Sequence, residues 1–281
     1  MAALAAPSAT PFFLARDQGQ RFCLYHAPAG RCRGAVLYLH PFAEEMNKAR
    51  RMAALQARAL AACGYGVLQI DLDGCGDSSG DFGDARWEGW LADVAAGRQW
   101  LEQQLDQPVT LWGLRLGALL ALDYAGRAQR PPPALLLWQP VLSGAACLTQ
   151  FLRLRLANAL LGEGQQGAGD DSASLRAALH AGNALEVAGY LLAPQLAAAL
   201  ERLDAATLAP PPCPVDWFDM VAAPERPLPL ASSRLGAAWR EGGCRLRQQA
   251  VSGPSFWSTQ EISESAELLA ATTALFSGAP A

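Results

Sequence analysis

The stretch that decides the fold is V-T-L-W-G-L-R-L-G-A-L-L-A-L-D-Y-A, residues 109–125. It begins with an apolar run of four residues that ends at Gly113. A short turn then reaches Gly117, and a run rich in Ala and Leu, which are strong helix formers, follows it. Glycines on both sides of so short a turn allow a strand and a helix to pack closely together. The stretch therefore predicts a buried strand, a sharp turn and a helix.

The two glycines are spaced as in G-x-S-x-G, the motif of a strained strand-to-helix turn that exposes a nucleophilic serine. Here the motif reads Gly113-Leu114-Arg115-Leu116-Gly117, so an arginine occupies the tip of the turn. A guanidinium stays protonated and has no lone pair with which to attack a carbonyl carbon. Acyl transfer of the serine type is therefore excluded at this position.

Apolar runs alternate with helix-like segments along the first half of the chain. The runs cover 34–40, 66–71, 109–112 and 134–138, and the segments before the turn cover 48–63 and 86–105. Continuous apolar runs that alternate with helices are typical of parallel strands covered on both faces. The sequence predicts an α/β fold with a mostly parallel central sheet flanked by helices. The residues after each run then share one carboxyl edge, where such sheets bind ligands.

The alternation stops near residue 143 and resumes near residue 212. The segment between reads as helices without intervening strands, over 148–161, 174–179 and 186–203. Later strands are predicted over 214–218 and 244–251 and later helices over 232–241 and 261–276, the last with a Ser258–Glu261 capping box. We predict a core of residues 1–142 and 212–281 with a helical cap, residues 143–211, inserted over the sheet edge. Residues up to about 20 are predicted to be irregular, before an early strand over 21–25.

The bulk composition excludes several classes of protein. A chain of 281 residues with 51% hydrophobic and 17% charged residues is typical of a well-packed globular protein. Its net charge of −4 provides no basic surface for nucleic acid. No apolar run reaches membrane-spanning length without a charge or a proline, and no basic region precedes an apolar one at the N-terminus. Seven irregularly spaced cysteines without C-x-x-C favour a reducing compartment, so we expect a cytoplasmic protein, without a cofactor.

Several motifs in order resemble a known superfamily. The stretches L-Y-L-H-P-F (37–42) and D-L-D-G-C-G-D-S-S-G (71–80), the Arg115 turn and the late strands resemble the α/β-hydrolase superfamily over nearly the whole chain. More narrowly, H-P-F-A-E-E-M-N-K, G-C-G-D-S-S-G-D, W-G-L-R-L-G and G-P-S-F-W resemble the "hydrolase 2" proteins associated with the exosortase A system. This second resemblance implies a link to exopolysaccharide and PEP-CTERM protein-sorting genes of Gram-negative bacteria.

The superfamily resemblance implies a triad in the order nucleophile, acid, base. Its nucleophile position is Arg115. The acid position falls best on Glu225 in E-R-P-L-P, with Asp216 and Asp219 as less well placed rivals. The base position, in the turn G-P-S-F, is Phe256. Because loss of a nucleophile and its base typically costs several orders of magnitude in rate, a conventional Ser-His-Asp mechanism is excluded.

Other groups at the same edge remain candidates for chemistry. The resemblance places the backbone N–H groups of Phe42 and Leu116 in the oxyanion positions. His40, the only histidine at a strand end, is either a displaced base or, as we favour, a structural hydrogen-bonding residue. Cys75 is either a relocated nucleophile or, as we favour, a small thiol in a glycine-rich loop.

Carboxylates add to the expected rim of the pocket. Glu44, Glu45 and Asp73 follow strand ends, and we expect them to form the rim together with Cys75 and Phe256. Because no ligand spacing supports a metal site, even one assembled from His40, Glu44 and Asp73, no metal is expected.

Arg115 itself allows three interpretations, because an unpaired buried charge costs several kcal/mol. The first is an internal ion pair with Glu44, Glu45, Asp73 or Glu225, which would fix the loops of a former active site. The second is an ion pair with a carboxylate or phosphate of a ligand, favoured by the dipole at the start of the following helix. The third is direct catalysis, in which the Arg115 charge stabilises the transition state electrostatically.

Two functional hypotheses follow. The first is an ester or thioester hydrolase with a non-standard site, acting in exopolysaccharide or PEP-CTERM processing. The second is a catalytically inactive pseudo-hydrolase that binds a small acyl or anionic ligand, or serves as a scaffold for proteins of the exopolysaccharide and exosortase system.

Overall fold

The computed structural model describes residues 9–160 and 171–278. Its strands form one sheet in the spatial order β1 (Ala9–Ala15), β2 (Gln20–His26), β4 (Tyr65–Ile70), β3 (Gly34–Leu39), β5 (Val109–Leu114), β6 (Leu135–Trp138), β9 (Val215–Val221) and β10 (Leu246–Ser252). β1 pairs antiparallel to β2, and β2 pairs antiparallel to β4. All pairs from β4 to β10 are parallel. The predicted α/β fold with a mostly parallel sheet is therefore confirmed.

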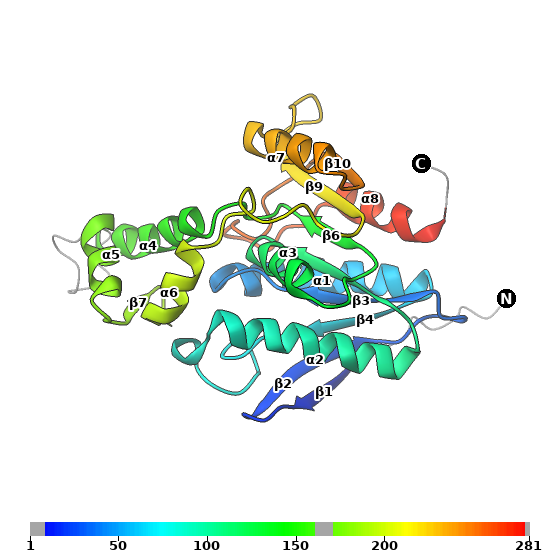
Figure 1. Ribbon diagram of the computed structural model, residues 1–281, viewed down its shortest axis with the longest axis horizontal. Coiled ribbons are helices and arrows are strands. Elements are labelled where there is room, and N and C mark those ends of the chain that lie inside the picture. The colour runs from blue at the N-terminus through cyan, green and yellow to red at the C-terminus, as the bar shows by residue number, and fades with distance from the viewer. Residues whose placement is uncertain (1–8, 161–170, 279–281) are drawn as a thin grey trace.

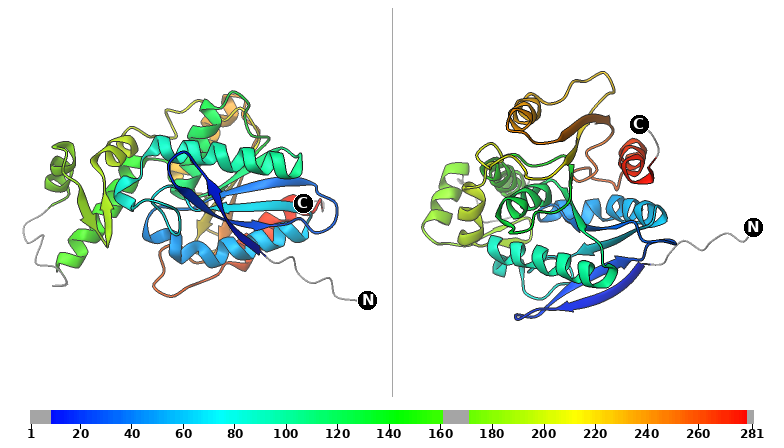
Figure 2. Two further views of the ribbon diagram at one scale, coloured as in Figure 1. Left: turned by 90° about the horizontal axis from the view of Figure 1, so that it is seen from below. Right: turned by 45° about the vertical axis from the view of Figure 1, so that its right-hand side comes forward.

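Helices cover both faces of the sheet (Figures 1 and 2). One face carries α1 (Glu44–Ala62) and α8 (Ala266–Ser277), and the other carries α2 (Trp87–Leu105), α3 (Leu116–Arg127) and α7 (Leu230–Glu241). Every residue of β3 and β6 is buried, because both faces of these strands are covered. On β9, Trp217 and Phe218 alternate between the two cores.

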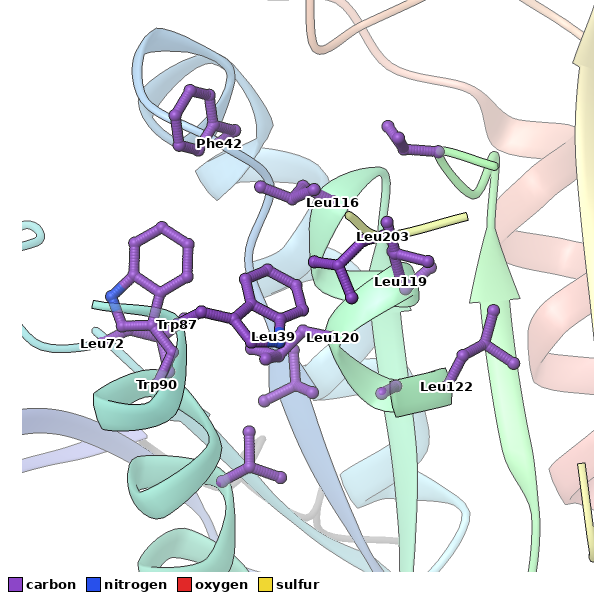
Figure 3. Close-up of a cluster of buried hydrophobic side chains, with 14 of the residues drawn as sticks. Leu39, Phe42, Leu72, Trp87, Trp90, Leu116, Leu119, Leu120, Leu122 and Leu203 are labelled. Atoms are coloured by element: carbon purple, nitrogen blue, oxygen red, sulfur yellow. The ribbon is translucent and has the colours of Figure 1, made fainter. Parts of the chain in front are cut away.

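The core beneath α2 and α3 supports the end of the sheet where the Arg115 turn lies. Figure 3 shows Leu116, Leu119, Leu120 and Leu122 of α3 in one cluster with Leu39 of β3, Leu203, and Trp87 and Trp90 of α2. Leu39, Leu119 and Leu120 are at most 1% exposed. Burial of this much apolar surface fixes the carboxyl ends of β3 and β5 relative to α3.

A group of elements is inserted between β6 and β9 and lies beyond one end of the sheet (Figure 1). It contains α4 (Gly144–Leu160), α5 (Ser172–His180), the hairpin of β7 (Leu185–Val187) and β8 (Tyr190–Leu192), and α6 (Pro194–Glu201). The continuous helix predicted over 186–203 is wrong. Ala188 and Gly189 form a two-residue turn with φ of 50° and 83°, which suits a hairpin, and Pro194 begins the helix that follows.

Three further boundaries differ from the predictions. Residues 9–15, predicted to be irregular, form the edge strand β1, where Phe12 stacks on Trp100 with ring centroids 4.6 Å apart. Helix α1 begins at Glu44 rather than at residue 48. Helix α8 begins at Ala266, because the Ser265 side chain accepts a hydrogen bond from the Leu268 N–H. The Ser258–Glu261 capping box is therefore wrong. The short 3-10 helix η1 (Phe82–Asp84) completes the described elements.

Candidate functional site

The turn between β5 and α3 holds Arg115 in a strained conformation, with φ of 56° and ψ of −116°. A Cβ atom at Gly113 would lie 2.4 Å from the Cα atom of Ala118, and one at Gly117 would lie 2.2 Å from the carbonyl oxygen of Leu39. Any side chain at either glycine would therefore collide with backbone. Close packing of strand and helix forces this turn, as the glycine spacing predicted.

Backbone hydrogen bonds secure the Arg115 turn from the neighbouring strand. The Arg115 N–H donates to the Trp138 carbonyl oxygen at 3.0 Å, and the Arg115 carbonyl accepts from the Val141 N–H at 3.1 Å. These bonds offset the strain of a positive φ at a residue with a side chain. The tip is thereby held in one orientation.

The Arg115 side chain forms an ion pair with Glu45, in the first turn of α1. Its Nε atom donates to Oε1 and Oε2 of Glu45 at 3.2 and 3.4 Å, and its Nη2 atom donates to Oε1 at 3.1 Å. The two side chains are only 14% and 16% exposed. The guanidinium carbon also lies 5.3 Å from the centroid of the Trp257 ring, within cation–π range. Of the four carboxylates considered from the sequence, Glu45 is therefore the partner.

The environment of Glu45 explains why this pair is formed. Burial raises the pKa of the Glu45 carboxyl, and the Arg115 charge with its hydrogen bonds opposes that rise. Without Arg115, the carboxylate would lie in a mostly dry environment with nothing to neutralise it. The pair thus connects the Arg115 turn between β5 and α3, the elbow, to the start of α1.

A cavity of about 340 Å³, the elbow cavity, adjoins this ion pair. Its walls come from the α1 start, the elbow, helix α4 and the loop before α8, and its residues are Phe42, Glu44, Glu45, Arg115, Cys147, Gln150, Phe151, Leu154, Trp257 and Ser258. The cavity is large enough for a small organic molecule. Its apolar side is formed mainly by aromatic rings, and its polar side by the ion pair and Glu44.

Two backbone N–H groups near the cavity have no hydrogen-bond acceptor in the described part of the chain. Neither the Phe42 nor the Leu116 N–H donates a hydrogen bond within the described residues. Phe42 lines the cavity, whereas Leu116 faces an adjoining void of about 10 Å³, which is too small for a ligand. Ala43, next to Phe42, is strained like the elbow tip, with φ of 49° and ψ of −124°. Strained turns therefore flank the cavity on two sides.

His40 is buried and both of its ring nitrogens are engaged. Nδ1 lies 2.8 Å from the Pro41 carbonyl oxygen, and Nε2 lies 3.2 Å from the Leu72 backbone N–H. The carbonyl requires a proton on Nδ1, so Nε2 accepts. Burial lowers the pKa of His40, which keeps the ring neutral. His40 therefore connects two loops and has no free nitrogen to act as a base.

Cys75 and Asp73 do not line the cavity, contrary to the expected rim. Cys75 is buried at the adjoining void, and burial together with the charge of Asp71 raises the pKa of its thiol. Asp73 forms an ion pair with Arg21 of β2 at 2.7 Å. Charges of Asp71 and Asp73 disfavour a thiolate, so Cys75 has no electropositive setting that would activate it.

Phe256 and Glu225 also lie elsewhere than expected. Phe256 is fully buried, with its ring centroid 6.2 Å from that of Trp138, so the rim assignment is wrong. Glu225 is exposed in the loop after β9 and forms no ion pair within the described residues. Asp219, one rival for the acid position, is buried in β9 and accepts a hydrogen bond from Ser232 at 3.0 Å.

Ser258 and the α4 side of the cavity were not predicted from the sequence, whereas Trp257 was one of the aromatic residues near the sheet edge that could line an apolar pocket. Cys147, Phe151 and Leu154 are spaced by four and three residues, so they share one face of α4. The sequence contains this spacing, but it does not indicate which part of the protein the shared face of α4 packs against. Trp257 follows the misassigned Phe256 directly.

No group of three or more potential metal ligands comes together within residues 9–160 and 171–278. Over the same residues, no helix is both long and apolar enough to cross a membrane.

Comparison with known proteins gives one family and many similar structures. The family model described as "Serine aminopeptidase, S33" matches residues 30–177. Lysophosphatidylserine lipase ABHD12 of Danio rerio is 28% identical over 152 residues, which are 46% of this chain and 38% of that protein. The chain thus spans well under half the length of this curated relative.

Solved structures of esterases and lipases share the architecture over 95–97% of the chain. Est1E from Butyrivibrio proteoclasticus with bound ferulic acid has a TM-score of 0.65 at 16% identity and covers 95% of this chain and 96% of its own. A thermostable carboxyl esterase from Bacillus coagulans has a TM-score of 0.65 at 15% identity, with 96% and 98% covered. A monoglyceride lipase from Saccharomyces cerevisiae has a TM-score of 0.62 at 13% identity, with 97% and 95% covered. At such identities the likeness concerns the fold.

Proposed function

The chain belongs to the family described as serine aminopeptidase S33 and has the α/β-hydrolase fold, and we propose that it binds a small molecule in its elbow cavity without hydrolysing it. The observation that carries this proposal is the Arg115–Glu45 pair. The group at the elbow tip is a guanidinium fixed by three hydrogen bonds and stacked on Trp257. It has no means of forming an acyl intermediate.

No neighbouring group is set up to replace the missing nucleophile. Cys147 lines the cavity, but burial and the charge of Glu45 raise the pKa of its thiol to about 12. Cys75 is a buried thiol as well, and both nitrogens of His40 are occupied. A thiol or imidazole in these surroundings is a poor nucleophile or base near neutral pH.

The cavity nevertheless offers what a small acyl ligand needs. Phe42, Phe151 and Leu154 provide apolar surface, and the Phe42 N–H, which has no acceptor among residues 9–160 and 171–278, can donate to a carbonyl oxygen. We further propose that residues 143–211 act as a cap on a core of residues 1–142 and 212–281, because α4 supplies one wall of the cavity.

An anionic ligand, one of the possibilities raised by the sequence, has little support in this geometry. Glu45 already takes the Nε and Nη2 donors of Arg115. The cavity lining contains two carboxylates and one guanidinium, so an added anion would meet net negative charge.

A second candidate is an ester or thioester hydrolase with a non-standard site, and the observation that favours it is Glu44. This carboxylate lines the cavity, and burial raises its pKa, as suits a general base. In either case the motif resemblance supports a place alongside the exopolysaccharide, exosortase A and PEP-CTERM proteins, and the cysteine pattern supports a cytoplasmic location.

The test combines turnover with binding. Purified wild type, Glu44→Gln, Arg115→Ala, His40→Ala and Cys75→Ala are incubated with acyl esters and thioesters of increasing chain length, and binding of the corresponding uncleavable ethers is measured by calorimetry. We expect ether binding by wild type and no turnover above buffer. Turnover by wild type that Glu44→Gln abolishes would instead establish the second candidate.

A further inference from the structure

Two cysteines lie side by side where strands β9 and β10 begin. The parallel register pairs Val215 with Leu246, so Cys213 and Cys244 stand opposite each other two residues before this pair. The two segments are still adjacent at that point, because the Val215 N–H donates to the Arg245 carbonyl oxygen at 2.9 Å. The Cys244 thiol itself donates to the Cys213 carbonyl oxygen at 3.8 Å. The two cysteines are therefore neighbours at the edge of the sheet that β10 forms (Figure 1).

Both thiols lie on the same face of the sheet. They belong to the core on the α7 side, which also contains Leu235 and Trp239 of that helix. Neighbouring strands run about 4.8 Å apart, and a disulfide needs Cα atoms separated by about 4.4–6.8 Å. Cys213 and Cys244, both present here as thiols, therefore stand at the spacing that a disulfide requires.

The backbone before Cys244 is suited to small adjustments. Gly242 and Gly243 precede it, and Gly243 has a φ of 87° and open space where a Cβ atom would lie. Gly243 and Arg245, on either side of Cys244, are exposed, and Cys244 itself is 8% exposed. A small molecule can therefore approach the Cys244 sulfur from solvent.

Cys244 is better suited than Cys213 to react first. Burial raises the pKa of both thiols, that of Cys213 to about 11. The charge of Arg240, in the last turn of α7, opposes the rise for Cys244. No cation does the same for Cys213, whose pKa the neighbouring Cys244 raises further. Because the thiolate is the attacking species in thiol–disulfide exchange, Cys244 is the expected nucleophile.

We propose that Cys213 and Cys244 form a reversible disulfide by exchange with a low-molecular-weight disulfide, for which oxidised glutathione is the probe. The Cys244 thiolate attacks one sulfur of oxidised glutathione, which breaks its S–S bond and releases one glutathione thiolate. The Cys213 thiolate then attacks the Cys244 sulfur of the mixed disulfide and releases the second glutathione. Two electrons and two protons pass from the protein thiols to glutathione, which leaves as two thiols. The new bond closes a loop that contains β9 and α7.

Peptide mapping of wild type tests the proposal. The protein is incubated at pH 8 with mixtures of reduced and oxidised glutathione, remaining thiols are blocked with iodoacetamide, and unreduced tryptic peptides are analysed by mass spectrometry. We expect the peptide of residues 241–245 joined to the peptide that contains Cys213, and we expect dithiothreitol to separate them. Absence of the joined peptides at every glutathione ratio would overturn the proposal. A glutathione adduct that persists at Cys244, or a disulfide to another cysteine as the main product, would overturn it too.

Variants locate the bond through stability. Oxidation is expected to raise the melting temperature of wild type by roughly 5–10 °C, because a cross-link constrains the unfolded chain. Cys213→Ala and Cys244→Ala are each expected to lose this rise, whereas Cys63→Ala, which removes a partly exposed thiol outside the pair, is expected to keep it. A rise that persists in Cys213→Ala or Cys244→Ala, or that disappears in Cys63→Ala, would overturn the proposal. Neither measurement involves the elbow cavity, so the proposed function stands or falls separately.

Discussion

The Nη2 atom of Arg115 donates to Oε1 of Glu45 across 3.1 Å, and this contact joins the tip of the elbow to the first turn of α1. In a serine hydrolase the same tip presents a reactive hydroxyl. Here it carries a charge whose hydrogen bonds hold the two strained turns beside the cavity, at Arg115 and Ala43, in place. Arg115, at the position where a serine hydrolase has its nucleophile, therefore connects two structural elements.

Removal of Arg115 is expected to destabilise the fold. Arg115→Ala leaves the mostly buried Glu45 carboxylate without its cationic partner, so we expect the free energy of unfolding, measured with urea, to fall by about 2–4 kcal/mol. Arg51→Ala, which breaks an ion pair with Glu264 whose side chains are 60% and 40% exposed, provides the surface comparison and is expected to lose under about 1 kcal/mol.

A double-mutant cycle separates the pair from other effects of the substitution. Arg115→Ala and Glu45→Ala combined are expected to cost clearly less than the sum of the two single variants, because no buried charge remains. Strict additivity would show that the two side chains do not depend on each other.

Two glycines of α3 provide a matched test of the elbow geometry. Gly117→Ala places a Cβ atom 2.2 Å from the Leu39 carbonyl oxygen, so we expect a large loss of thermal stability or no folding. A Cβ atom at Gly126 meets nothing within 4 Å, so Gly126→Ala is expected to stabilise α3 by up to about 1 kcal/mol. A Gly117→Ala variant with the melting temperature of wild type would show that strand and helix do not pack so closely.

Buried histidine makes stability depend on pH. Burial lowers the pKa of His26 on β2 to about 4, from the 6.5 of the free side chain. The unfolded chain therefore binds this proton at a higher pH than the folded chain does, so the contribution is complete above about pH 6.5 and is lost as the pH falls towards 4. We expect His26→Gln to show a flatter fall in urea stability over this window than wild type. Parallel profiles of urea stability against pH for wild type and His26→Gln would contradict the lowered pKa of His26.

The thiols are expected to react in order of exposure. Cys32 and Cys63 are partly exposed, whereas Cys75 and Cys147 are buried with raised pKa values. Iodoacetamide at pH 8, followed by peptide mass spectrometry, should modify the first two well before the others. Rapid modification of Cys75 or Cys147 would contradict this order and support a cysteine nucleophile at the site.

The sequence predicted the elbow well because its requirements are local. Two glycines at fixed spacing, an apolar run before them and helix formers after them determine the turn around Arg115 without reference to the rest of the chain. The sequence did not determine which carboxylate pairs with Arg115. Helix α1 begins at Glu44, four residues earlier than predicted, and this places Glu45 on a rigid first turn that faces the elbow.

The errors share a physical origin in long-range packing. Phe256 occupies the position that the resemblance gives to a histidine, yet its apolar ring is more stable in the core beside Trp138, which brings Trp257 to the cavity. The hairpin at 185–192 was missed because its short apolar runs fit a helix as well as strands. Only the two positive φ angles at Ala188 and Gly189 decide between them.

A cavity that binds an ester without hydrolysing it leaves the bound ester intact, so binding and hydrolysis are followed on one ester. Wild type at a concentration above its dissociation constant is incubated with a hexyl ester found to bind by calorimetry, and the ester is then recovered and quantified by mass spectrometry. We predict that bound ester is recovered intact, at the level of a buffer control. Conversion of the bound ester to acid and alcohol by wild type would contradict the account.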